Sequence, residues 1–315
     1  MTPTPWRVCL GFAAGVLLAN RSAAQPPSVE AELAPINSHQ ASLFRIPGIF
    51  EIDLPTTERA GSVQLSFQPR FQDLLDKNYL RLPLGLRWGV NDHFELNSDI
   101  ETHIDSGLRG TRSSYGFTAL HFGAKYAWHD WLKPTWDTSA GFNSSFPVSR
   151  PPLDLTDGHD HFAPYIVFGR KVPGAPGLSG FIHAGLDFMW KSATPGVFAR
   201  NEPHSNSATL SSGLIYDRKA FHYALEIDAT TTSLVGTGHH YFVTVRPGIV
   251  WDLPDQLKLY ARGRWLVGFI VNSTFGPDGN TIGTGGRFRG EINLTRLLGR
   301  NRPDRDPPDP PPPGR

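Results

Sequence analysis

The strongest constraint in this sequence is an alternation of apolar and polar residues that persists over long segments. Between residues 80 and 90, leucine, tryptophan or valine occupies every second position, and arginine, proline or glycine occupies the positions between them. Residues 221–228 repeat the pattern, with His222, Glu226 and Asp228 on the polar side. Because successive side chains of a β-strand point to opposite faces, a period of two predicts strands with one apolar and one polar face.

Twelve such segments follow one another from residue 61 onward. They span about 61–71, 79–90, 93–104, 115–129, 134–146, 159–170, 179–190, 205–216, 220–229, 239–251, 257–268 and 281–294. Strands of soluble proteins usually have about five or six residues, whereas tilted strands that cross a bilayer need about 9–11. A barrel in lipid also requires an apolar outside and a polar inside. The sequence therefore predicts an all-β fold, a transmembrane antiparallel up-and-down β-barrel of about 12 strands.

The links between these segments alternate in length. Short links at 91–92, 217–219 and 254–256 follow even-numbered strands, and longer links such as 147–158 and 272–280 follow most odd-numbered ones. Outer-membrane barrels combine short periplasmic turns with longer external loops. The parity therefore predicts that both ends of the barrel are periplasmic.

Three segments lie outside the predicted barrel, which we place at 61–295. Residues 1–24 are typical of a cleaved signal peptide, because Arg7 precedes the apolar run 8–18 and Ser22-Ala23-Ala24 fits a small-residue cleavage site. Residues 25–60 are predicted to be a periplasmic N-terminal segment or a plug of the lumen. Residues 296–315 are rich in proline and are predicted to be a disordered tail.

Several functional classes are disfavoured by composition and by missing motifs. The 30 Lys and Arg nearly balance the 29 Asp and Glu, so there is no cationic excess for nucleic acid. The single Cys provides neither a disulfide framework nor a cysteine-based metal site. The sequence contains no phosphate-binding loop, dinucleotide fingerprint or G-x-S-x-G elbow. We therefore expect no cofactor and no enzyme activity.

The sequence also resembles a known family. Residues 84–96 (LGLRWGVNDHFEL) resemble the GLxYGxTDxxEL hairpin of an outer-membrane β-barrel transporter family that includes members of a MetA-like pathway of phenol degradation. Residues 120–126 (LHFGAKY) resemble the LxLGxKY strand that follows, and 146–147 with 162–165 resemble a later section of that family. The resemblance covers about residues 80–190. It implies a bacterial outer-membrane barrel with a transport role, and it brings no catalytic residues. The chain departs from many such barrels in ending with Arg315 rather than an aromatic residue.

The alternation assigns many charged side chains to the inside of the barrel. Nine of eleven inward cations fall on the predicted strands ten, eleven, twelve, one and two, which closure would make neighbours. This predicted basic wall consists of Arg70, Arg81, Arg87, Arg246, Lys258, Arg262, Arg264, Arg287 and Arg289, and the other two inward cations are Lys125 and Arg170. The predicted acidic side consists of Glu95, Asp99, Glu101, Asp187, Glu226 and Asp228, with Asp137 and Glu291 as further inward acids. We expect a field across a water-filled lumen that weakly prefers anions.

One loop combines carboxylates with imidazoles. Asp157, His159, Asp160 and His161 are candidate metal ligands, because oxygen ligands suit Ca²⁺ and a His-x-His pair suits a transition metal. The alternative is an ordinary polar external loop.

The function predicted from these features is a passive pore or transporter for small polar or anionic solutes in the cell outer membrane. The expected partners are outer-membrane lipid, the barrel-assembly machinery and a small-molecule solute, with no nucleic acid. Three alternatives remain open: a structural outer-membrane barrel with a filled lumen, a secreted soluble β-protein, and a barrel hydrolase.

Overall fold

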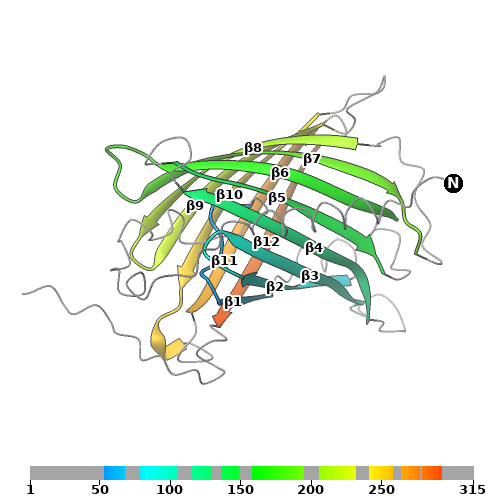
Figure 1. Cartoon of the computed structure of the whole chain (residues 1–315), viewed down its shortest axis with the longest axis horizontal. Helices are drawn as coiled ribbons and strands as arrows, with labels where there is room; N and C mark the ends of the chain where they lie inside the picture. The colour runs from blue at the N-terminus through cyan, green and yellow to red at the C-terminus, as the bar shows by residue number, and fades with distance from the viewer. Residues whose placement is uncertain are drawn as a thin grey trace, which may run out of the picture. The chain divides into compact units, whose positions relative to one another are not determined.

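Twelve antiparallel strands close into a barrel in the part of the chain that the structure describes (Figure 1). The structure, a computed structural model, describes residues 53–67, 79–105, 115–129, 136–148, 158–194, 206–231, 241–257, 264–276 and 279–292. Each strand pairs with its neighbours in chain order, and β1 pairs with β12 to close the sheet. The predicted up-and-down barrel of about 12 strands is therefore confirmed.

The strands have the length that the alternation predicts, with 11–15 residues in all but β1. They are β1 (Val63–Phe67), β2 (Tyr79–Gly89), β3 (Phe94–Asp105), β4 (Tyr115–His129), β5 (Trp136–Pro147), β6 (His159–Lys171), β7 (Leu178–Lys191), β8 (Asn206–Arg218), β9 (Phe221–Thr231), β10 (Tyr241–Asp252), β11 (Arg264–Gly276) and β12 (Gly279–Ile292). No helix in the described part of the chain is long and apolar enough to cross a membrane.

The eleventh strand and the links on either side of it differ from the prediction. We predicted this strand at 257–268, but β11 spans Arg264–Gly276, and the 3₁₀ helix η4 (Asp255–Leu257) precedes it. The link after β10 is therefore long, and only residues 277–278 separate β11 from β12. The prediction was wrong because Leu266 and Ile270 belong to a buried cluster inside the barrel. The inward row of this strand is apolar in its middle, which hides the period-two pattern.

The outer face of the barrel is apolar. In β9, Phe221, Tyr223, Leu225 and Ile227 are exposed, whereas the residues between them are buried or half-buried. Exposed aromatic residues also gather near the short-turn ends of the strands, where the rings of Phe221 and Trp251 stack with centroids 6.2 Å apart. Other members of this band are Trp88, Trp128 and Tyr216. An alternating strand pattern thus gives an apolar belt around a closed sheet.

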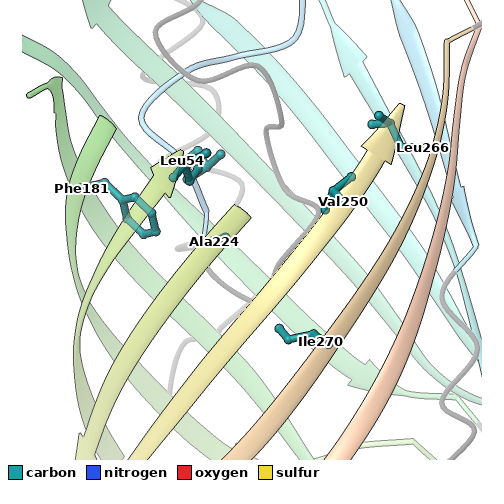
Figure 2. Close-up of a cluster of buried hydrophobic side chains, with 7 residues drawn as sticks. Leu54, Phe181, Ala224, Val250, Leu266 and Ile270 are labelled. Atoms are coloured by element: carbon teal, nitrogen blue, oxygen red, sulfur yellow. The ribbon is translucent and has the colours of Figure 1, made fainter. Parts of the chain in front are cut away.

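An apolar cluster occupies part of the interior towards the short-turn ends. Its members on the strands are Phe181, Ile215, Ala224, Val250, Leu266 and Ile270, which belong to β7, β8, β9, β10 and β11. Leu54, which precedes β1, inserts its side chain among them and is only 1% exposed (Figure 2). Burying one leucine side chain contributes about 1.5–3 kcal/mol. The chain before β1 is therefore anchored inside the barrel.

Candidate functional site

Residues 53–58, which we call the inserted segment, lie inside the barrel. All six residues are buried. Leu54 contacts the apolar cluster of β7–β11, while its carbonyl oxygen accepts hydrogen bonds from Lys125 Nζ at 3.4 Å and Ser139 Oγ at 3.5 Å. Because Lys125 is on β4 and Ser139 is on β5, the inserted segment contacts opposite parts of the barrel wall.

A network of buried charges holds the polar side of this segment. Glu95 Oε1 accepts from Arg87 Nη1 at 3.3 Å and lies 3.4 Å from Lys125 Nζ. Glu95 Oε2 accepts from the backbone N–H of Glu58 at 2.7 Å. Glu95 and Lys125 are both fully buried. A buried charge is tolerated when it is paired and hydrogen-bonded, and here both partners satisfy that condition.

Asp53 joins the same network from the inserted segment. Its Oδ1 accepts from Arg87 Nη2 at 3.4 Å, and its Oδ2 accepts from Asn143 Nδ2 at 3.0 Å. Burial alone would raise the pKa of the Asp53 carboxyl, but the positive charges of Arg87 and Lys125 and the Asn143 hydrogen bond hold that pKa below its ordinary value. Asp53 is therefore an anion that links the inserted segment to β2 and β5.

The backbone of the segment also approaches β2 closely. A Cβ atom at Gly89 would collide with the backbone oxygens of Glu58 and Arg59. Gly61 N donates to Gly89 O at 2.6 Å, and Gly89 N donates to Ser62 O at 3.0 Å. Only a residue without a side chain leaves room for this approach.

A cavity of about 670 Å³ occupies the lumen beyond the inserted segment, and Asp53 and Arg87 form part of its wall. The lining comes from the inserted segment and strands β1 to β10 and is rich in hydroxyl, amide, imidazole and charged groups. Small-molecule sites usually have volumes of about 300–1,000 Å³. The cavity is therefore large enough for a small polar solute.

The five carboxylates that line this cavity all have a basic partner. Arg87 contacts Asp53, Arg81 contacts Glu101 at 3.5 Å, and Arg246 contacts Asp228 at 3.3 Å. His121 Nδ1 lies 2.8 Å from Asp99, and His161 Nδ1 lies 2.9 Å from Asp187. The three arginine pairs therefore compensate their charges locally, and the two histidines each hold a carboxylate through Nδ1.

The structure consequently places the predicted wall residues beside acids rather than opposite them. Arg81, Arg87 and Arg246 each contact a carboxylate of the adjacent strand, at 3.3–3.5 Å. Glu226 is fully buried and is paired in register with Arg246. The sequence prediction used strand parity alone, which gives the face of a residue but not the partner that its side chain selects.

Other members of the predicted basic wall are only partly described. Arg289 is paired in register with Leu266 and Ser66, and Arg287 is paired with Gly268. Arg264 is the first residue of β11. Arg70, Lys258 and Arg262 lie outside the described residues.

Arg170 does not face the lumen, contrary to its predicted assignment. It is paired in register with Trp136 and Gly180, and its guanidinium lies over the Trp136 ring at 5.2 Å. It shares the face of β6 that carries Phe168, which pairs with the half-exposed Ile182. Arg170 is therefore part of the outer surface, where a long side chain can hold its charge near an aromatic ring.

The candidate metal ligands are divided between two faces of β6. His159 and His161 share one face, and Asp160 falls on the other, because neighbouring strand residues alternate. Asp157 lies outside the described residues. Within the described ranges, no group of three or more His, Cys, Asp or Glu side chains is arranged to hold a metal ion.

The sequence did not predict the contacts that the inserted segment makes inside the barrel. Asp53, Leu54 and Glu58 lie in a short stretch with no period-two pattern, and their hydrogen-bond partners on β2 to β5 are 34–90 residues away in the chain. The sequence does show a leucine between two acidic residues just before the first strand. That pattern alone does not indicate which residues of the barrel they contact.

No protein-family model matches the chain, and no curated protein matches it. Among solved structures, it is similar to the KdgM porin in complex with disordered oligogalacturonate, with 12% identity and a TM-score of 0.43 over 73% of this chain and 98% of that chain. It is also similar to Pseudomonas aeruginosa OccK5 (OpdH), with 8% identity and a TM-score of 0.35 over 73% of this chain and 63% of that one. The beta domain of the Bordetella autotransporter Brka gives 11% identity and a TM-score of 0.36 over 73% and 96% of the two chains. The barrel assignment rests on the strand pairing of the chain itself.

Proposed function

We propose that this chain is an outer-membrane β-barrel that passes small polar solutes passively, with the inserted segment restricting the lumen. The observation that carries the proposal is a polar cavity of about 670 Å³ inside a closed barrel whose outer face is apolar. A closed sheet satisfies its backbone hydrogen bonds without an edge, which lipid requires. A polar interior then provides a path for polar solutes across the membrane, which the lipid itself does not provide.

The proposed membrane location is supported by three features of the strands. Apart from β1, they have 11–15 residues, enough to cross a bilayer at a tilt. Their outward residues include many exposed leucine, isoleucine and phenylalanine side chains. Aromatic residues such as Trp88 and Trp128 are exposed near the short-turn ends, as in the belts of membrane barrels.

The finer parts of the proposal come from the sequence. Residues 1–24 would direct export and be removed, and the barrel-assembly machinery would insert the chain among outer-membrane lipids. The resemblance of residues 80–190 supports a transport role of the kind linked to a MetA-like pathway. A preference for anions would depend on Arg287 and Arg289, because Arg81, Arg87 and Arg246 are paired with acids and Arg264 is paired in register with Glu291.

The test combines a folding assay with a permeability assay. Purified protein should migrate differently on a cold SDS gel before and after boiling, because closed membrane barrels resist SDS until heated. Liposomes containing it should then swell in isotonic solutions of small polar solutes. A soluble protein with no gel shift would overturn the membrane barrel, and a shifting protein that admits no solute would overturn the pore.

A structural barrel with a filled lumen is the second candidate, and the inserted segment favours it. Leu54, Asp53 and Glu58 contact strands on several sides of the interior. Under this alternative, weakening the segment would leave the membrane impermeable, whereas under the proposed function it would increase solute flux. The two candidate functions therefore predict different solute fluxes for a variant with a weakened inserted segment, and not only for the native protein.

A further inference from the structure

We propose that the cavity contains a binding site for an uncharged, polyhydroxylated solute of monosaccharide size. This inference rests on the proposed function and specifies its solute class. It follows from the way in which charges, imidazoles and polar atoms are arranged on β3 to β7.

The charge pairing argues against a strongly charged ligand. Every carboxylate of the described lining has a basic partner within 3.5 Å. An anion would have to approach these carboxylates, and a cation would compete with arginine side chains that already satisfy them. An uncharged solute meets neither penalty and keeps the pairs intact.

Two acid–imidazole pairs flank a serine across the strands. Ser145 on β5 is paired in register with His121 on one side and His161 on the other. Asp99 and Asp187 contact the Nδ1 atoms of these two histidines at 2.8 and 2.9 Å. A carboxylate only accepts hydrogen bonds, so each ring donates to its carboxylate from Nδ1. The pairs thus fix the tautomer and orientation of both rings.

The wall of β7 supplies further polar atoms that the described residues leave without a hydrogen bond. They are Asp187 Oδ1 and His183 Nδ1, and both residues line the cavity. The His183 ring also stacks on Tyr165, with centroids 5.3 Å apart and an interplanar angle of 29°. Buried polar atoms usually have a partner, so these two atoms leave hydrogen-bonding capacity in the wall of the cavity.

The chemistry of these groups selects hydroxyl groups. Asp187 Oδ1 can accept a hydrogen bond, the Arg246 guanidinium has N–H donors beyond the two that contact Asp228, and the Asn97 and Asn143 amides can both donate and accept. A hydroxyl both donates and accepts, so a molecule with several hydroxyls can satisfy all these groups without carrying charge. The cavity of about 670 Å³ accommodates such a molecule together with water.

The experiment uses three solutes of similar size: glucose, gluconate and glucosamine. Their rates of entry into proteoliposomes are measured for the native protein and for Glu95→Ala, in which the inserted segment is weakened. We expect glucose to enter faster than both charged solutes at neutral pH. In a His121→Leu/His161→Leu variant, glucose entry should fall about two- to tenfold, as for the loss of one or two neutral hydrogen bonds. The glucosamine-to-glucose ratio should rise, because Asp99 and Asp187 then lack their partners.

The matched control is His222→Leu. His222 is also an interior histidine paired with carboxylates, Asp217 at 2.6 Å and Asp252 at 3.2 Å, but it does not line the cavity. This variant should keep the native order of the three solutes, and the gel shift on heating confirms that each variant folds.

The outcomes separate this inference from the proposed function. Faster entry of gluconate or glucosamine than of glucose would overturn the polyol site and leave the pore intact. Unchanged glucose entry and an unchanged glucosamine-to-glucose ratio in His121→Leu/His161→Leu would also overturn the site. Entry of none of the three solutes, in native and Glu95→Ala barrels that shift on heating, would overturn the pore and the site together.

Discussion

The Glu95 carboxylate joins the inserted segment to the barrel wall, so replacing it tests how the segment is held. In a Glu95→Ala variant, Arg87 and Lys125 lose contacts of 3.3 and 3.4 Å, and the Glu58 N–H loses its acceptor at 2.7 Å. Lys125 is fully buried. Removing one partner of a buried ion pair costs about 3–5 kcal/mol, because the other charge remains buried without compensation.

Most of this cost is relieved if the inserted segment leaves its place, because water can then reach Lys125 and Arg87. The strand ladder does not depend on Glu95, so the barrel itself should remain closed. A change of about 3–5 kcal/mol shifts the equilibrium between the bound and released segment by about two to four powers of ten. The variant should therefore be a more open channel rather than an unfolded protein.

Single-channel recording in planar bilayers measures this shift as the fraction of time spent in the most conductive state. We expect that fraction to rise at least about a hundredfold in Glu95→Ala, the lower end of the range above, or to saturate near one. Asp187→Asn is the control, because Asp187 lines the cavity and pairs with His161 but makes none of the contacts that hold the segment. Native-like conductance of Glu95→Ala, with the gel shift on heating retained, would refute the reasoning.

Three further predictions concern the same segment. Leu54→Ala removes most of a side chain that is 1% exposed and should weaken the binding of the inserted segment to the barrel by about 2–5 kcal/mol. Conductance should therefore rise. An unchanged conductance would show that the apolar cluster does not hold the segment. Gly89→Val places side-chain atoms where the backbone oxygens of Glu58 and Arg59 lie, so it should raise conductance while a Val at the exposed outer position Leu86 should not. Because the folded-state pKa of Asp53 is lowered from 3.8, its contribution is fully present above the unfolded value and is lost as pH falls through that value towards the folded one. Conductance should therefore rise as pH is lowered through about 4, and Asp53→Asn should be more open at neutral pH and should lose this carboxylate's part of the pH response.

The regular part of the fold could be predicted because each strand carries its own pattern. In β9, Phe221 and Tyr223 are outward and His222 is inward, and both facts follow from a period of two within the strand. The same reasoning located β2, β4 and β6 to within one residue at each end. Local alternation determines these strands because shifting the pairing register by one residue would turn every apolar side chain towards the lumen.

The sequence-based predictions that were wrong concern contacts between residues far apart in the chain. The position of β11 was wrong because Leu266 and Ile270 belong to the same buried cluster inside the barrel as Leu54, about two hundred positions away in the chain. Arg170 was assigned inward, although its pairing with Trp136 places it outside. The charge partners of Arg81 and Arg246 were likewise not visible, since side-chain reach and not strand parity decides which carboxylate is contacted.

The first strand has a topological consequence. β1 runs antiparallel to both β12 and β2, so those two strands run in the same direction. If β1 were absent, the last strand would meet β2 as a parallel neighbour, and an alternating sheet could not be completed. β1 therefore corrects the direction at the seam. Because β1 begins a few residues after the inserted segment, β1 also fixes one end of that segment at the seam. Closure of the barrel and restriction of its lumen therefore become coupled steps of assembly.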